Sequence, residues 1–308
     1  MQARTFQQVD VFTDTAFLGN PLAVVLDGTG LSDAQMQSFA RWTQLSETTF
    51  VLPPTPEGAA GGADYRVRIF TPGMELPFAG HPTLGTAHAW LSVGGQPRQS
   101  GQLVQECGVG LVTLKQLGER WAFAAPPLTR SDISAEDLGP VLAALGLDAS
   151  EVIAAQSLNN GPHWLGLLVD SVDTVLALEP DHAALKKLGT KVGVAARRPA
   201  PAGGLIRRAN REARAFTASN TRIANDPTDL EVRAFAAPVG VAEDPVTGSL
   251  NASLAQWLMA DGHMPGTYSA RQGTVLGRAG QVFLSQDTQA QVWVGGDVVG
   301  CIQGTVNL

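Results

Sequence analysis

Apolar and polar positions alternate along several short stretches, and a period of two is typical of strands with one buried face. Residues 65–70 show this alternation, and residues 230–236 show it again in the second half of the chain. Residues 83–91 and 249–259 are apolar almost all round, which indicates buried helices. Gly- and Pro-rich loops separate these elements. The pattern predicts an α+β fold of many short strands and a few helices, not a helical bundle.

Short sequence motifs indicate where a further helix, a strand and a loop begin and end. Ser32 and Gln35 form the capping-box pattern S-x-x-Q, so we expect a helix over residues 32–42. A β-rich strand is expected at residues 48–52. Residues 53–63 have no pattern of their own, which predicts an exposed and mobile loop.

The two halves of the chain repeat a pattern. V-R-x-F at residues 67–70 recurs at residues 232–235, and each copy precedes a loop and a small-residue helix that ends in Trp-Leu, at 90–91 and 257–258. Because the matches keep the same order, they indicate an internal duplication. The length of 308 residues also suits two domains, since a single core rarely exceeds about 250–300 residues.

A duplication has a consequence for ligand binding. If two related domains packed about a pseudo-twofold axis, the N-termini of two equivalent helices would face one cleft. Free N–H groups and positive potential at a helix N-terminus favour a carboxylate. Gly80 and Gly248 would let a ligand approach the backbone closely. The same glycines would also serve ordinary turns and close packing, and the pattern alone does not separate the two roles.

Composition and charge exclude several classes of function. The formal net charge is −7 and no basic tract occurs, which argues against a nucleic-acid partner. No apolar run reaches the roughly 18 residues of a membrane span, and no signal peptide is evident, so we expect a cytoplasmic protein. The two cysteines and five histidines lack metal-site spacing, and no dinucleotide or triphosphate motif occurs. We therefore expect neither a metal nor a cofactor.

Three polar clusters could carry chemistry. Glu47 stands between a predicted helix and a predicted strand, either as a solvated loop residue or as a half-buried acid with a raised pKa. His81 precedes an apolar helix, either as a helix-entry residue or as a donor to a substrate. Pro245 restricts Asp244 to extended backbone, which fits both an ordinary turn and a carboxylate directed into a cleft.

These clusters lie in stretches that resemble the PhzF-like phenazine-biosynthesis family. The matching stretches follow the family order over nearly the whole chain: QVDVFTDTAFLGNPLAVVLD, LSETTFVLPP, DYRVRIFTPGMELPFAGHPTLGTAHAWL, LVQECGVG, EDPVTGSLNASLAQWL and RQGTVLGR. The resemblance implies a fold similar to diaminopimelate epimerase. In that fold two pseudo-symmetric domains, each a curved, mostly antiparallel sheet around a central helix, form the active site in the cleft between them.

The predicted domain division lies at the two prolines 126 and 127, which polar residues follow. We expect an N-terminal domain at 1–127 and a C-terminal domain at 128–308. The resemblance makes the last strand, at about 297–308, a candidate to complete the N-terminal domain.

The resemblance also implies the site residues. The catalytic glutamate of the family falls on Glu47, and its accompanying polar residues fall on His81, Asp244 and Ser249. We expect catalytic roles for Glu47, His81 and Asp244. Substrate binding is expected of Gly80, Gly248 and Ser249.

The cysteines argue against one mechanism of this fold. In its amino-acid epimerases, two cysteines stand at the two helix N-termini. Here those loops carry Gly80 and Gly248 with their polar neighbours, and Cys107 and Cys301 lie elsewhere. A mechanism with two thiols therefore fits poorly.

The main hypothesis is a cofactor-independent isomerase that moves a proton on a small carboxylate substrate, with Glu47 as the acid–base group. One alternative is an epimerase or racemase with non-thiol bases, and another is a non-catalytic protein that binds small acids. The loops at 53–63 and 200–204 are expected to select the substrate. The resemblance also leads us to expect a homodimer.

Overall fold

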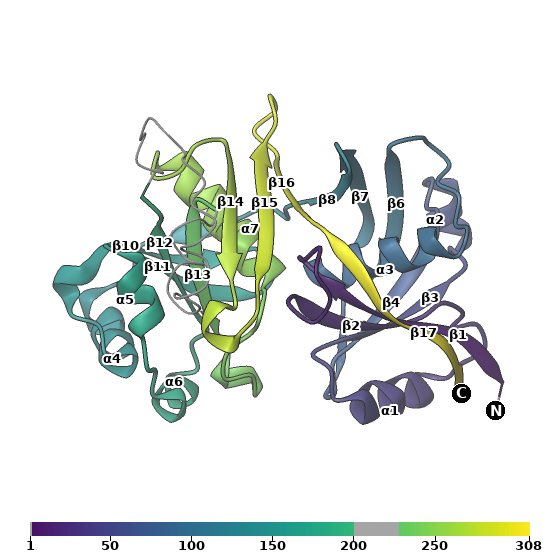
Figure 1. Ribbon diagram of the computed structural model, residues 1–308, viewed down its shortest axis with the longest axis horizontal. Helices are drawn as coiled ribbons and strands as arrows, with labels where there is room; N and C mark the ends of the chain where they lie inside the picture. The colour runs from purple at the N-terminus through teal and green to yellow at the C-terminus, as the bar shows by residue number, and fades with distance from the viewer. Residues whose placement is uncertain (1, 200–227) are drawn as a thin grey trace, which may run out of the picture.

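A computed structural model describes residues 2–199 and 228–308 of the chain (Figure 1). The described residues combine many short strands with seven α-helices, so the predicted α+β class is confirmed. The helices are α1 (Asp33–Thr43), α2 (Pro56–Ala60), α3 (Gly80–Ser92), α4 (Ala135–Leu145), α5 (Val172–Ala177), α6 (His182–Leu188) and α7 (Gly248–Ala260).

The strands within the described residues form one connected, mostly antiparallel sheet. They are β1 (Ala3–Val11), β2 (Asn20–Val25), β3 (Thr48–Leu52), β4 (Tyr65–Phe70), β5 (Glu75–Leu76), β6 (Gln102–Cys107), β7 (Gly110–Leu117), β8 (Arg120–Ala124), β9 (Thr129–Ser131), β10 (Val152–Asn159), β11 (His163–Val169), β12 (Val192–Arg197), β13 (Leu230–Phe235), β14 (Thr267–Gln272), β15 (Gly280–Gln286), β16 (Val292–Gly296) and β17 (Val298–Asn307).

One succession of strand pairings occurs twice in the sheet. Strands β1, β2, β3, β4, β6, β7 and β8 pair in this order as antiparallel, parallel, antiparallel, parallel, antiparallel and antiparallel. Strands β10 to β16 pair with the same alternation. The two halves lie side by side and join where β8 pairs with β16 (Figure 1).

The last strand returns to the first half. β17 pairs antiparallel with β1, from Ala3 opposite Asn307 to Val11 opposite Val298. In Figure 1 it crosses from β16 toward the N-terminus. Residues 125–128 connect β8 to β9 without regular structure. The domain division at residue 127 itself stays a prediction.

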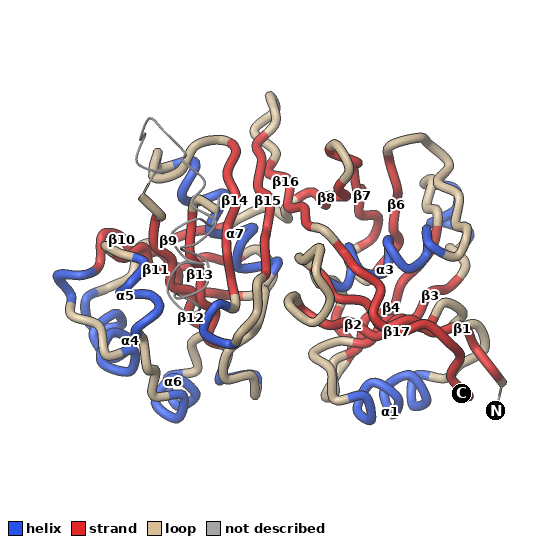
Figure 2. Tube along the Cα trace, in the orientation of Figure 1, coloured by secondary structure: helices blue, strands red, loops and turns tan. Residues whose placement is uncertain are grey.

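Helices α3 and α7 are buried, as their apolar patterns predicted. Leu84 of α3 and Leu250 of α7 are almost fully enclosed, and strands surround both helices (Figure 2). Gly85 of α3 lies against β1 and β2. A Cβ added there would lie 2.6 Å from Leu22 and 2.9 Å from Val11, so the helix packs on these strands without room for a methyl group.

The capping-box prediction is confirmed. Gln35 donates its backbone N–H to the Ser32 hydroxyl at 3.3 Å, and its side chain accepts the Ser32 N–H at 2.9 Å. The helix begins one residue later, as expected for an N-cap serine. The predicted strand over 230–236 is also present as β13. Both of its faces are buried, because Val232 packs in the core that includes α7 while Phe235 packs in the core that includes α5 and α6.

The expectation of a patternless loop at residues 53–63 is wrong. The short helix α2 lies within this segment, capped by the Thr55 hydroxyl, which accepts the Gly58 N–H at 3.0 Å. Glu106 of β6 accepts hydrogen bonds from the N–H and the hydroxyl of Thr55, at 2.8 and 2.7 Å. A carboxylate from a distant strand thus fixes the start of the helix, which local sequence does not reveal.

The close packing of α3 predicts the effect of one methyl group. Gly85→Ala should lower the free energy of unfolding by about 1–3 kcal/mol, because the new Cβ would displace Leu22 and Val11. Gly266→Ala, in the exposed bend before β14, is the control. Its Cβ would meet nothing within 4 Å, so alanine should change the free energy of unfolding by less than about 0.5 kcal/mol. Urea unfolding of both variants measures the difference, and equal stabilities would contradict the tight fit.

Candidate functional site

The first residues of α3 and α7 lie against each other. A Cβ at Gly248 would lie 3.2 Å from the Gly80 Cα. This distance leaves little room for a side chain on either residue. Neither N-cap residue, Ala79 or Thr247, caps its helix with a side-chain hydrogen bond. The first turns of two helices therefore lie together, and in the described part of the chain neither has a side-chain cap from its N-cap residue, which is a favourable setting for an anion.

Glu47 and His81 meet beside these helix ends. Glu47 follows α1 and immediately precedes β3, and His81 is the second residue of α3. The Glu47 Oε2 and His81 Nε2 atoms are 3.3 Å apart, and the two side chains are 16% and 7% exposed. Neither atom has a hydrogen-bond partner of good geometry in the described part of the chain. Buried polar atoms are rarely left unsatisfied, so this pair marks a place for a ligand.

The Asp244 carboxyl is fixed by hydrogen bonds from both halves of the chain. The Thr247 hydroxyl donates to its Oδ2 at 2.6 Å, and Asn20 of β2 donates to its Oδ1 at 3.1 Å. The same Asn20 amide donates to the Val246 carbonyl at 2.9 Å. Asn20 therefore ties the first half of the sheet to the loop that precedes α7.

Burial shifts the pKa values of Glu47, Asp244 and His81. It raises the pKa of Glu47 to about 7, and the negative charge of Asp244 adds to the rise. Burial also raises the pKa of Asp244 to about 6, although hydrogen bonds from Thr247 and Asn20 act to lower it. Burial lowers the pKa of His81 to about 3, so its imidazole is neutral. Two carboxyl groups close to neutral pKa suit proton transfer near pH 7.

Ser249 lies in the first turn of α7. Its hydroxyl oxygen accepts a hydrogen bond from Trp164 Nε1 at 3.2 Å, and its carbonyl accepts one from Asn160 at 3.0 Å. The bond from Trp164 orients the hydroxyl but leaves its proton available to a ligand.

The structure therefore brings together the residues expected at the site. Glu47 lies beside His81 and is affected by the charge of Asp244, and Gly80 contacts Gly248, with Ser249 next in the chain. Of the two loops expected to select the substrate, residues 200–204 lie outside the described part of the chain.

Sequence reasoning missed two amides that support the site. Asn20 is one, and Gln272 of β14 is the other. Gln272 donates to the Thr247 hydroxyl at 3.0 Å and accepts the Thr247 N–H at 3.1 Å. Both amides are almost completely buried. A buried amide in a strand needs partners, but only the fold identifies them.

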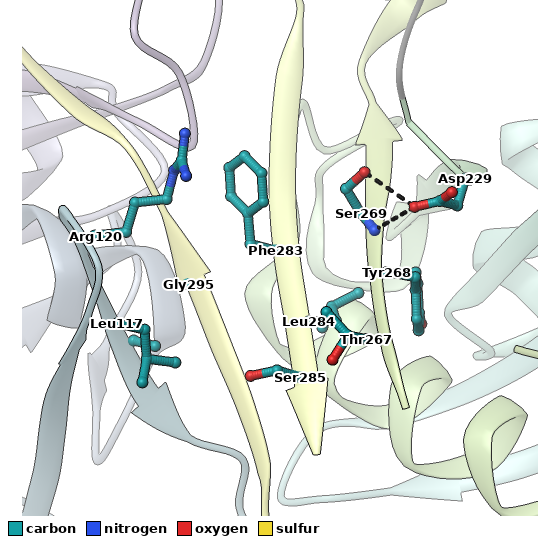
Figure 3. A pocket seen from close by; sticks show the side chains of 11 residues that line it. Leu117, Arg120, Asp229, Thr267, Tyr268, Ser269, Phe283, Leu284, Ser285 and Gly295 are labelled. Carbon is teal, nitrogen blue, oxygen red and sulfur yellow. Dashed lines mark hydrogen bonds between the residues drawn. The ribbon is translucent and has the colours of Figure 1, made fainter. Parts of the chain in front are cut away.

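A hollow of about 380 Å³ lies elsewhere, between β8 and the strands β14 to β16 (Figure 3). Arg120 in its wall stacks over the Phe283 ring at 3.8 Å and pairs with Asp297 at 2.8 Å. Asp229 accepts the N–H and hydroxyl of Ser269. Because protein partners already engage both charges, this hollow gives no comparable reason to place chemistry there.

Residues 2–199 and 228–308 contain no group of three or more His, Cys, Asp or Glu side chains placed to hold a metal ion. In the same part of the chain, no helix is long and apolar enough to span a membrane.

Comparison with known sequences gives relatives over the whole chain. The family model described as phenazine biosynthesis-like protein matches residues 9–304. Antisense-enhancing sequence 1 of Schizosaccharomyces pombe is 33% identical, over 99% of each chain. The trans-2,3-dihydro-3-hydroxyanthranilate isomerase of Pseudomonas fluorescens is 31% identical, over 97% of this chain and 98% of that one.

Comparison with solved structures supports the fold. A PhzF-family phenazine biosynthesis protein of Bacillus anthracis superposes with a TM-score of 0.79 at 20% identity, over the full length of both chains. A probable proline racemase of Agrobacterium radiobacter superposes with a TM-score of 0.58 at 14% identity, over 99% of this chain and 93% of that one. At these identities the likeness shows the fold alone.

The raised pKa of Glu47 predicts a stability that depends on pH. The folded state holds this proton up to about pH 7, whereas the unfolded chain releases it near its ordinary value of 4.5. Burial of Glu47 therefore lowers the stability progressively as the pH rises between these values. At about pH 8, the free energy of unfolding of Glu47→Gln in urea should exceed that of the wild type by roughly 1–3 kcal/mol. This difference should vanish toward about pH 4.

Glu119→Gln, in the exposed turn between β7 and β8, is the control for this measurement and should match the wild type at both pH values. If Glu47→Gln were no more stable than the wild type at about pH 8, the pKa of Glu47 would not be raised in the folded state.

Proposed function

The chain belongs to the phenazine biosynthesis-like family, and on that premise we propose that it is an isomerase that moves a proton on a small carboxylate substrate by acid–base catalysis. The observation that carries the proposal is the buried Glu47 carboxyl, 3.3 Å from the neutral His81 imidazole. Among the described residues, neither of the two facing atoms has a hydrogen-bond partner. Relatives named as isomerases support the reaction class.

The substrate carboxylate is placed at the joined N-termini of α3 and α7. Gly80 and Gly248 carry backbone N–H groups in the first turns of these helices, and Ser249 adds a hydroxyl. These donors are fixed before the substrate arrives, and they lie where negative charge develops when a carbon adjacent to a carboxylate loses its proton.

Glu47 is the base that takes the proton from one substrate carbon. The protonated carboxyl then delivers the same proton to another carbon of the conjugated system, so one C–H bond breaks, one forms and no electrons are exchanged with an outside reagent. Near-neutral pKa makes both directions accessible. His81 orients Glu47, and Asp244 supports it through its charge. This reaction uses only the chain's own side chains.

An epimerase with non-thiol bases is the second candidate, because Glu47 and Asp244 are two carboxyl groups that act on one another in the same buried place. Cys107 lies in β6 and Cys301 in β17, away from both helix N-termini. In deuterated water an epimerase introduces label at a stereocentre and inverts it, whereas the isomerase moves a double bond and changes the ultraviolet spectrum. A protein that only binds small acids would show neither change.

We also infer two pseudo-symmetric domains, 1–127 and 128–308, with the C-terminal strand assigned to the first. The repeated succession of pairings supports this division, as does the place of α3 and α7 at the same point of each succession. The pairing of β17 with β1 supports the assignment of that strand.

The proposal includes a homodimer formed through β17. This strand carries no charged residue and no proline, and residues 302–305 are exposed. Gln2 and Leu308 exchange both backbone bonds, so the alternation of an antiparallel pair directs the N–H groups of Gln303 and Thr305 away from β1. In the described part of the chain those groups have no hydrogen-bond partner. A neutral edge lets two chains of net charge −7 pair about a twofold axis.

Loss of the proposed base should abolish turnover. Glu47→Gln should fold and bind the substrate acid while its kcat falls by about 10²- to 10⁴-fold, because an amide cannot exchange the proton. The first probe is the substrate in the relative's name, trans-2,3-dihydro-3-hydroxyanthranilate, followed by ultraviolet absorbance and by proton NMR in deuterated water. Glu119→Gln is the matched control, and wild-type turnover in Glu47→Gln on any substrate found would overturn the assignment.

A proline in the outer edge of β17 should separate two copies. Gln303→Pro removes an N–H that points away from β1, so the fold should keep its stability while the dimer becomes a monomer in light scattering. Val306→Pro removes an N–H that points toward Arg4 of β1 and should lower stability instead. A wild-type monomer, or a Gln303→Pro dimer, would contradict the β17 interface.

A further inference from the structure

The two V-R-x-F repeats hold their arginines in the same way. Arg68 of β4 donates Nε and Nη2 to the two Glu75 oxygens, at 2.7 and 2.6 Å. Arg233 of β13 donates the same two nitrogens to the Glu243 oxygens, at 3.0 and 2.8 Å. Each guanidinium also lies over the phenylalanine that ends its motif, 5.1 and 4.9 Å from the ring centre. The chain therefore uses a bidentate Arg–Glu fork twice, on the loops that lead to α3 and α7.

The two forks differ in burial. The side chains of Arg68 and Glu75 are 17% and 41% exposed, whereas those of Arg233 and Glu243 are 4% and 7% exposed. Arg233 also donates to two backbone carbonyls near α5, at 3.1 and 2.7 Å. A buried ion pair is weak evidence for stability, because desolvation offsets much of the attraction. The main effect of this pair is the geometry that it imposes on the loop before α7.

The buried fork fixes the backbone next to a proposed catalytic acid. Glu243 immediately precedes Asp244, and the Asp244 N–H donates to the Ala234 carbonyl of β13 at 2.9 Å. The loop is therefore fastened to β13 at two successive residues, once by the fork and once through the backbone. The Asp244 side chain is then free to meet Thr247 and Asn20 at the N-terminus of α7.

We propose that the Arg233–Glu243 fork is the positioning device of the active site, which holds Asp244 at the N-terminus of α7 and within electrostatic reach of Glu47. This inference rests on the proposed function. The two residues act through Asp244 and are positioning residues, since neither has been placed against the substrate.

The charges around Asp244 give the fork a second effect. Glu243 adds to the rise in the pKa of Asp244 that burial causes, and Glu47 and Asp244 repel each other when both are ionised. His81 lies next to Glu47, and its imidazole is neutral, so it adds no charge. Arg278 packs near the loop but directs its guanidinium to two backbone carbonyls of the first half. Removal of the Glu243 charge should therefore lower the pKa of Asp244.

Two substitutions separate geometry from charge. Arg233→Lys keeps a cation but loses the planar fork, so kcat should fall by about 10- to 100-fold with a smaller change in KM and an unchanged pH profile. Glu243→Gln removes a negative charge next to Asp244, so the titration of the Asp244 carboxyl should move to lower pH. A merely structural role would lower the unfolding midpoint and leave kcat and the profile of the folded enzyme as they are.

The first-repeat arginine supplies the matched control. Arg68→Lys breaks the same kind of fork on the loop that leads to α3, but its partner Glu75 is half-exposed and five residues before Gly80. It should change kcat by less than about threefold and leave the pH profile unchanged. If Arg233→Lys does not fold, the pair Arg233→Met with Glu243→Met provides an apolar replacement of similar volume, a type that commonly folds, and its kcat should fall in the same way.

A titration separates this inference from the proposed function. In protein labelled with ¹³C at aspartate carboxyl groups, the pKa of Asp244 should be lower in Glu243→Gln than in the wild type. An unchanged pKa would overturn the charge effect of Glu243, and wild-type kcat in both folded Arg233 variants would overturn the positioning role. If the wild type does not turn over the probe acid, the proposed function fails on that probe. The carboxyl ¹³C signal of Asp244 then decides the role of the fork, because it should shift in Arg233→Lys if the fork positions Asp244 and stay in place if it does not.

Discussion

The structure depends on the contact between the N-termini of α3 and α7. Two helix ends, each with unpaired N–H groups and positive potential, would normally repel or bind water. Here they touch through Gly80 and Gly248, whose Cα atoms come close because neither carries a side chain. That contact concentrates positive potential in a buried place, and every acidic group of the site is arranged around it.

Burial of acids at this point opposes folding. Glu47 and Asp244 both lose hydration, and each makes ionisation of the other harder. Hydrogen bonds from Asn20 and Thr247 offset part of this cost for Asp244, whereas the Glu47 atom that faces His81 has no such partner within residues 2–199 and 228–308. The uncompensated group is the one to which we assign the chemistry, in line with the trade between stability and activity seen at active sites.

The two halves contribute different parts of one site. Glu47 and His81 come from the first half, and Asp244 and Ser249 from the second. Neither half holds the whole set, so their relative position matters as much as their internal folds. The pairing of β8 with β16 joins the halves, and Asn20 bridges them next to the acids. The Arg–Glu fork occurs in both halves with different burial: it is half-exposed in the first half and buried beside an acid in the second.

Much of the fold and of the site was predictable from local sequence. Apolar periodicity predicted the buried helices α3 and α7, S-x-x-Q predicted the start of α1, and the clusters around Glu47, His81 and Asp244 are the polar groups that the fold gathers. Periodicity and caps depend on neighbours within a few residues, so the sequence carries them directly.

The tertiary structure alone decided which distant groups meet. It brought Asn20 to Asp244, Gln272 to Thr247 and Glu106 to the start of α2. It also set the pKa of Glu47, because desolvation depends on everything packed around a carboxyl and not on its neighbours in the chain. The sequence by itself determined which residues could act as acids and where helices begin, and long-range packing determined which acids were buried and what they faced.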